Sequence, residues 1–163
     1  MLTKNFYSFM RAALQGVSAE FTKVSGNTTY MQLSSATVPL RVMSQWSGVA
    51  EGYGVSFGTG TTPPTMSDYV LESILGNTQI SVVTPNSVSF SRGDNFDEYS
   101  VSFGITNITD EAITISEVGL TAVPQNAQYV LVDRSALDTP VTIPPHETKH
   151  IAYTIRFNYG DVV

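Results

Sequence analysis

The chain has 163 residues, with eight basic and 14 acidic side chains, a formal net charge of −6 and no cysteine. This length predicts one domain with its own core. The lack of cysteine excludes disulfides, thiolate metal sites and cysteine nucleophiles, the scattered cations argue against a nucleic-acid surface, and no apolar run approaches the roughly 20 residues of a membrane-spanning helix. Only 13% of residues are charged, which suits a surface buried against neighbouring subunits.

Residues 4–15 predict a short amphipathic helix, with Thr3 as its cap and Gly16 as its end. Its apolar side chains are Phe6, Phe9, Met10, Ala13 and Leu14. We therefore divide the chain into an N-terminal arm, 1–16, and a single β-sandwich domain, 17–163. The arm either covers an open edge or end of its own sandwich or docks on another subunit, and docking would make Phe6, Phe9, Met10 and Leu14 assembly contacts. No signal-peptide core is expected in this arm, because Ser8 interrupts its short apolar run.

Residues 19–24 and 28–33 predict a hairpin around Ser25-Gly26-Asn27. A further strand is expected at 40–45, and Trp46 follows it as a core or interface anchor, our fifth candidate assembly contact. Residues 52–65 begin as a strand and end as a loop, because two successive prolines remove backbone donors.

One short helical turn is expected near 67–75, opened by Ser67 or Asp68 and ended at Gly76-Asn77. A second hairpin is expected from 79–83 and 87–91. The polar and acidic segment 92–98 then reads as a loop.

The strongest strand signals lie between residues 98 and 159. Apolar and small polar residues alternate at 98–108 and again at 150–159, as they do in half-buried strands. A third strand at 112–122 is expected to form a tight antiparallel connection with the first through 109–112. Beyond it we expect a strand at 129–132, a polar turn at 133–137 and a short strand around Val141. Together these signals predict an all-β fold, an antiparallel β-sandwich or jelly roll.

Two motifs match patterns of catalytic or metal-binding sites, but their surroundings in the sequence do not fit those functions. Gly54-Val55-Ser56-Phe57-Gly58 matches the G-x-S-x-G pattern of a hydrolase, but a loop follows where a nucleophile elbow needs a helix. His146 and His150 are four residues apart, and in an extended segment their rings would lie about 13 Å apart, too far for one metal ion. We expect a strand serine and two surface histidines, and no catalytic residue, metal site or cofactor.

The acidic segment 94–98 contains Asp94, Asp97 and Glu98, the densest set of hard oxygen ligands in the chain. It fits the alternating pattern of a calcium loop only loosely, so a solvated acidic loop is the preferred interpretation and ion binding stays open.

A sugar-binding platform is the main alternative function, because the sequence has aromatic residues that could stack on a sugar. The candidates are Tyr30, Trp46, Tyr53, Tyr69, Tyr99, Tyr129, Tyr153 and Tyr159. A single tryptophan is few for a carbohydrate-binding module, and most of these tyrosines sit at strand positions typical of core-edge packing.

Several short stretches resemble, in this order, small β-rich virion structural proteins of tailed double-stranded DNA bacteriophages. They are Gly-Thr-Gly-Thr-Thr-Pro-Pro-Thr at 58–65, Asp-Tyr-Val-Leu-Glu-Ser at 68–73, Ile-Thr-Ile-Ser-Glu-Val-Gly-Leu at 113–120, Leu-Val-Asp-Arg-Ser-Ala-Leu at 131–137 and Thr-Pro-Val-Thr-Ile-Pro-Pro at 139–145. The resemblance spans about residues 50–160 and leaves out the N-terminal arm.

The resemblance implies a non-enzymatic structural subunit of a virion, present in several copies and without a cofactor. Its partners would be copies of itself and other head or tail proteins, and the resemblance does not decide between capsid, collar, tail and fibre. It transfers no catalytic residue. Within the matching stretches, Gly58 and Gly60 are expected to permit turns, and Asp133 with Arg134 to form an ion pair at a turn.

Overall fold

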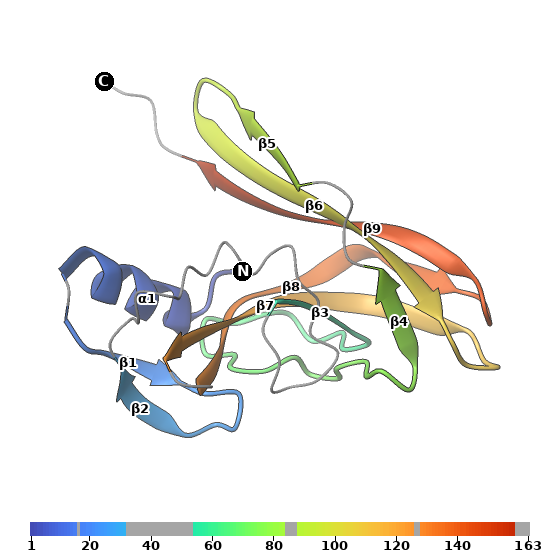
Figure 1. Cartoon of the computed structure of the whole chain (residues 1–163), viewed down its shortest axis with the longest axis horizontal. Helices are drawn as coiled ribbons and strands as arrows, with labels where there is room; N and C mark the ends of the chain where they lie inside the picture. Colours follow the sequence, from blue (N-terminus) through green and yellow to red (C-terminus); the bar gives the residue numbers. More distant parts are fainter. Residues whose placement is uncertain (16, 32–53, 84–87, 126–127, 159–163) are drawn as a thin grey trace.

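A computed structural model describes residues 1–15, 17–31, 54–83, 88–125 and 128–158 of the chain. In these ranges the protein has one helix and nine strands (Figure 1). They are α1 (Lys4–Gln15), β1 (Ala19–Thr22), β2 (Thr28–Met31), β3 (Gly54–Gly58), β4 (Ile80–Val83), β5 (Val88–Arg92), β6 (Phe96–Asn107), β7 (Ile113–Gln125), β8 (Gln128–Ile143) and β9 (Thr148–Asn158).

The strands form two main antiparallel sheets and one separate strand pair. One sheet has the order β3-β7-β8. In the other, β6 pairs with β9 along one edge, while β4 and β5 follow each other along its opposite edge, at 104–107 and 97–101 of β6. The remaining pair, β1-β2, lies beside α1 (Figure 1). This architecture confirms the predicted all-β sandwich with a short N-terminal helix.

A single hydrophobic core joins the two sheets. Phe57 of β3 and Phe103 of β6 meet edge to face, with ring centroids 5.6 Å apart. The predicted alternation is clearest in β9, where Ile151, Tyr153 and Ile155 are buried and the residues between them are exposed. In β6, Val101 and Phe103 are buried on either side of the exposed Ser102.

The hairpin predicted at the start of the domain is confirmed by β1 and β2, which pair antiparallel from Ala19↔Met31 to Thr22↔Thr28. Gly26 lies in its turn with φ = 83°, in the left-handed region that glycine adopts most readily.

The predicted tight connection between β6 and β7 is wrong, because the two strands belong to different sheets. The chain crosses from one sheet to the other after Asn107, which is fully buried. Its side-chain amide donates to the carbonyls of Glu111, Ile143 and Pro144 at 2.7, 3.0 and 3.2 Å. A buried Asn thus satisfies backbone groups that a hairpin ladder would otherwise have paired.

The predicted polar turn at 133–137 is also wrong, because this segment lies inside β8, a strand of 16 residues. Its register with β7 shifts between Ile115 and Glu117 and between Leu120 and Thr121. Such irregularities let a long strand stay paired while it bends. The polar residues that suggested a turn are buried in the sheet instead: Asp133 and Arg134 are only 7% and 4% exposed.

Two smaller predictions fail for related reasons. The strands β4 and β5 do not form a hairpin with each other, since both pair with β6. The helical turn expected near 67–75 does not form either: this segment contains a turn, bends and one isolated bridge between Gly58 and Ile74. The apolar side chains of this segment contact the sheet instead: Leu71 and Leu75 are buried, Leu71 next to Gly119 of β7 and Leu75 next to β3.

The N-terminal helix packs on its own fold. Phe9 and Ala12 belong to the core, and Phe6 packs against it. Ahead of the helix, the Thr3 N–H donates to the Val132 carbonyl at 3.0 Å, which ties the segment to the outer edge of β8.

Candidate functional site

The feature of the fold that stands out is the 59–79 loop, the 21 residues between β3 and β4. Loops of more than about 12–15 residues without regular structure are uncommon in compact domains and are usually functional or disordered. This loop is ordered, because Thr59 N–H donates to Ser73 O and Leu75 N–H donates to Phe57 O, each at 2.8 Å, so that it folds back along the free edge of β3.

A buried ion cluster anchors the 59–79 loop to the sheet. At its centre Arg134 of β8 donates from Nε to Oε2 of Glu117 on β7 at 2.9 Å, and these side chains are 4% and 0% exposed. The other guanidinium nitrogens reach the loop: Nη1 donates to Asp68 Oδ2 at 2.7 Å, and Nη2 lies 3.4 Å from Glu72 Oε2. One cation thus holds three carboxylates, two of them from the loop.

The carboxylates are also satisfied by backbone donors of the loop. Glu117 Oε1 accepts from the N–H groups of Gly60 and Ser73 at 3.1 and 2.7 Å. Glu72 Oε2 accepts from the N–H groups of Thr61 and Thr62, each at 2.9 Å. These bonds join the outgoing and returning arms of the loop, so the cluster sets the loop's shape as well as its position.

The two glycines of the matching stretch 58–65 make this close packing possible. A Cβ on Gly60 would lie 2.5 Å from Glu117 Oε1, and one on Gly58 would lie 2.6 Å from the Ser73 carbonyl oxygen. The prediction that Gly58 and Gly60 permit turns is wrong, since neither is among the described positive-φ residues. They are needed instead because other atoms of the protein lie too close to leave room for a Cβ.

The electrostatics of the cluster favour its charged form. Partial burial raises the pKa of Asp68, but the Thr65 N–H and the Arg134 guanidinium outweigh it, so the pKa lies below the usual value. Hydrogen bonds from Thr62 lower the pKa of Glu72. Burial opposes the charge of Arg134, yet its bonds to Asp68 and Glu117 raise its pKa overall. The ion pairs therefore persist at neutral pH.

The expected ion pair between Asp133 and Arg134 does not form, because neighbouring residues of a strand point to opposite faces. Asp133 accepts a hydrogen bond from the Tyr153 hydroxyl at 2.9 Å and lies 3.1 Å from the amino nitrogen of Met1. Burial, together with the charge of Asp133, raises the pKa of Tyr153 well above its usual value.

The anchored loop displays an apolar surface, which we call the loop-tip surface: Met66, Ser67 and Tyr69, with Lys4 of α1 beside them. Met66 and Tyr69 are 46% and 40% exposed. The Lys4 N–H donates to the Met66 carbonyl at 2.9 Å, and the Tyr69 ring lies against Gly26 of the β1–β2 turn. Three separate segments of the chain therefore meet at this surface.

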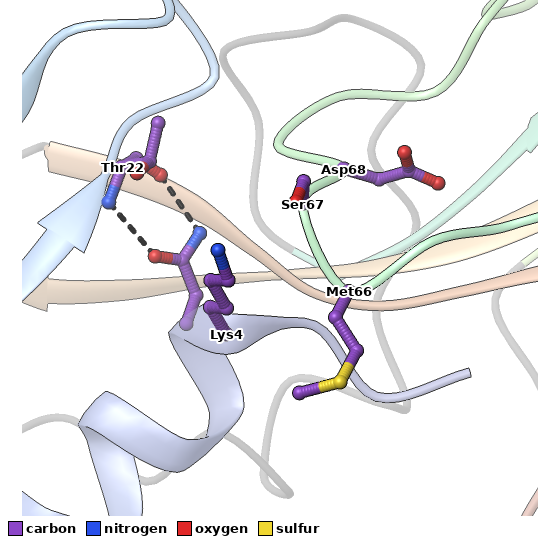
Figure 2. Close-up of a pocket in the computed structure, with 6 residues that line it drawn as sticks. Lys4, Thr22, Met66, Ser67 and Asp68 are labelled. Atoms are coloured by element: carbon purple, nitrogen blue, oxygen red, sulfur yellow. Dashed lines mark hydrogen bonds between the residues drawn. The ribbon is translucent and has the colours of Figure 1, made fainter.

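A small pocket of about 180 Å³ opens beside the loop-tip surface. Figure 2 shows Lys4 and Thr22 on one side and Met66, Ser67 and Asp68 on the other. Asn5 also lines the pocket, and its side-chain amide exchanges two hydrogen bonds with the Thr22 backbone, at 2.7 and 2.8 Å. Its lining combines the cation of Lys4 and the carboxylate of Asp68 with neutral polar side chains and the apolar Met66.

The five candidate assembly contacts have different positions. Phe6 is packed against the ring of Phe157, with centroids 6.3 Å apart, and Phe9 is 8% exposed. Of the candidates whose side chains the structure describes, only Met10 is exposed, at 40%. The side chain of Leu14 and the whole of Trp46 lie outside the described residues, as does the strand expected at 40–45.

The acidic segment 94–98 is not a loop throughout, as expected from the sequence, because Asp97 and Glu98 belong to β6 and both form ion pairs. Asp97 pairs with Arg92 at 2.7 Å, and Glu98 pairs with Arg156 of β9 at 2.6 Å. No group of three or more His, Asp or Glu side chains in the described ranges could hold a metal ion.

The other singled-out polar residues also have structural surroundings. Ser56 lies inside β3, opposite Gly119 of β7, and not at a strand-to-helix turn. His146 lies in the turn between β8 and β9, where its Nε2 is 3.0 Å from Asp110 Oδ1, while His150 lies on the exposed face of β9.

Comparison with known proteins finds no matching family model, no matching curated protein and no matching solved structure. Among the described residues no helix is long and apolar enough to cross a membrane.

The sequence pattern does not indicate the ion cluster. Its members are separated by up to 66 positions, and no two of them are adjacent in the sequence. One signal was present: Glu117 is the one charged residue in the run 113–120, whose other members are apolar or small, and a charge at such a position requires a buried partner.

Proposed function

We propose that the protein is a non-enzymatic structural subunit of a tailed-phage virion that docks on copies of itself and on other head or tail proteins. The observation that carries the proposal is that the stretches resembling such proteins meet in space. Thr62, Asp68, Glu72, Glu117 and Arg134 come from four of these stretches and form one hydrogen-bonded cluster. The resemblance therefore describes one structural unit, the anchored loop, instead of scattered short strings.

The chemistry of the surface supports a docking role. A long loop held rigid by buried charges loses little conformational entropy when it binds a partner. Its tip carries a methionine and a tyrosine, residue types enriched at protein interfaces. The low charge of the chain leaves little electrostatic repulsion to oppose close packing of subunits.

The test has two steps. Mass spectrometry of purified particles from the phage that encodes this chain should first detect it as a stoichiometric component. The double variant Met66→Ser/Tyr69→Ser should then fold normally but enter particles at least tenfold less, because the apolar contacts of the loop-tip surface are lost. Val83→Ser, at a 58% exposed apolar position on β4, is the matched control and should be incorporated fully.

Absence of the chain from particles would refute the virion role. Normal incorporation of the double variant would refute the loop-tip surface as the docking site. Deleting residues 1–16 is a poor substitute for this test, because Phe9 and Ala12 are part of the core.

Binding of a host-surface glycan is the second candidate, favoured by one observation: an exposed tyrosine lies close to the polar pocket of Figure 2. A tyrosine face can stack on a sugar ring while Lys4 and Ser67 hydrogen-bond to its hydroxyls. A glycan array probed with the wild-type chain and with Tyr69→Ala would detect such binding, and no retained glycan would dismiss it.

A further inference from the structure

The sheet edges of the protein are not equally protected. The free edge of β3 is covered by 73–75 of the loop, and the outer edge of β8 is covered at 131–134 by the N-terminal segment. Farther along β8, Asp138 and Pro140 stand on an exposed stretch. Prolines, charges and covering segments are the usual means of preventing unwanted pairing at an edge.

The free edge of β9 has neither a proline nor a covering segment in the described ranges, and of its two cationic residues, Lys149 and Arg156, the second is paired with Glu98 of its own chain. All 11 residues from Thr148 to Asn158 pair with β6 in unbroken register, without a bulge, and the strand contains neither proline nor glycine. Figure 1 shows β9 on the side of β6 opposite to β5, and no described strand pairs with its other edge. Such an edge is a template for another strand.

The hydrogen-bond pattern shows which backbone groups are available. The Asn107 N–H donates to the Glu147 carbonyl at 3.0 Å, directly beyond the pair Thr106↔Thr148. Since bonded and non-bonded pairs alternate in an antiparallel ladder, the odd residues of β9 bond to β6. The even residues therefore direct their N–H and C=O groups to the free edge. They are Thr148, His150, Ala152, Thr154, Arg156 and Asn158.

The side chains of β9 are nearly symmetric about Tyr153, reading Ile-Ala-Tyr-Thr-Ile over 151–155. A two-fold axis at Tyr153 would place Ile151 opposite Ile155 of a second copy on the core side, and Ala152 opposite Thr154 on the outer side. It would also place even residues opposite even residues, so that the available N–H and C=O groups bond to each other.

The charges are compatible with the same register. Lys149 would face Phe157, and His150 would face Arg156, whose guanidinium is already paired with Glu98 of its own chain at 2.6 Å. No two unpaired like charges would meet across the junction, as antiparallel strand pairing requires.

From these observations we propose that the β9 edge pairs antiparallel with the β9 edge of a second copy of this chain, in the register centred on Tyr153. The two four-stranded sheets, each made of β4, β5, β6 and β9, would join into one continuous sheet. This inference rests on the proposed function for its setting, a subunit that binds copies of itself, and names the surface that does so.

Charge pairs at 152 and 154 test the proposal, since in this register each position faces the other on the second copy. We expect the wild-type chain to be a dimer by sedimentation velocity. Ala152→Asp/Thr154→Asp should weaken the dimer at least tenfold because acid faces acid, whereas Ala152→Asp/Thr154→Lys should restore it because acid faces base. The control Ser89→Asp/Ser91→Asp puts two acids on the same outer sheet face but at the opposite edge, on β5, and should leave the dimer intact.

Circular dichroism must show that every variant is folded. An unfolded variant is replaced by Ala152→Pro, which removes one N–H from the free edge and leaves the hydrogen bonds between β9 and β6 in place. The proposal would be overturned if the wild-type chain were a monomer, if the Asp/Asp variant dimerised as well as the wild type, or if the Asp/Lys variant did not restore association. The edge would then bind a different protein or none. The virion role is judged separately, by the presence of the chain in particles.

Discussion

At the scale of single residues, the unusual feature is how much charge the protein buries. Arg134 and Glu117 are buried beneath the 59–79 loop, with side chains 4% and 0% exposed, and transfer of such groups from water costs several kcal/mol per ion. The cost is offset because every side-chain oxygen and nitrogen of these two charged groups has a near partner, including the backbone N–H groups of Gly60, Glu72 and Ser73 on Glu117. Loop order and charge burial therefore depend on each other.

Arg134→Met tests this dependence. Removing the guanidinium leaves Glu117 as an uncompensated buried charge, and we expect the free energy of unfolding to fall by about 3–5 kcal/mol. Urea denaturation followed by circular dichroism measures it. Arg11→Met, which removes an exposed cation bonded only to Gln15 among the described contacts, should change it by less than about 0.5 kcal/mol. Equal effects of the two variants would show that the cluster does not stabilise the fold.

At the scale of elements, α1 combines two surfaces that its sequence does not distinguish. Phe9 is buried in the core, whereas Met10, the next residue, is 40% exposed. The same apolar spacing that suggested docking on another subunit is used to close one end of the chain's own sandwich. Only the accessible part of this face remains for a partner.

A pair of substitutions on the helix separates these roles. Phe9→Ala should lower the free energy of unfolding by about 3–4 kcal/mol, because it removes a buried ring and leaves a cavity. Met10→Ala should change it by less than about 0.5 kcal/mol, since the side chain is largely in water and alanine favours helix. Thermal and urea unfolding of both variants measure the difference. A stable Phe9→Ala protein would mean that α1 is not part of the folding unit.

At the scale of the whole molecule, the two sheets share one core but no strand pairing. They are joined by side chains such as Phe57 and Phe103, and by crossings such as the one that Asn107 fixes after β6. Packing of this kind couples the two sheets, because separating them would expose the apolar face of each sheet to water.

We therefore expect a single cooperative unfolding transition. Far-ultraviolet circular dichroism and tyrosine fluorescence should give the same urea midpoint, and Phe103→Leu should move both to lower urea together. Two separated transitions in the wild-type chain would contradict this, and would indicate that the sheets fold as independent units.

Local pattern was sufficient for the most regular strands and for the class of fold. The alternation at 98–108 and 150–159 determined two half-buried strands, because side chains of a strand point by turns to opposite faces. The glycine-centred turn at 25–27 was equally local. What alternation cannot contain is the identity of each strand's neighbour, which is why two expected hairpins proved to be contacts with other strands.

The candidate site was decided by tertiary structure alone. Asp133 and Arg134 have the composition of a turn, and only the partners supplied by Glu117, Asp68 and Tyr153 allow them to stay inside a long strand. The sequence by itself determined which residues alternate and therefore that the chain forms layers. The choice of strand neighbours, the anchored loop and the open edge of β9 depend on interactions between residues far apart in the chain, whose energies no local pattern records.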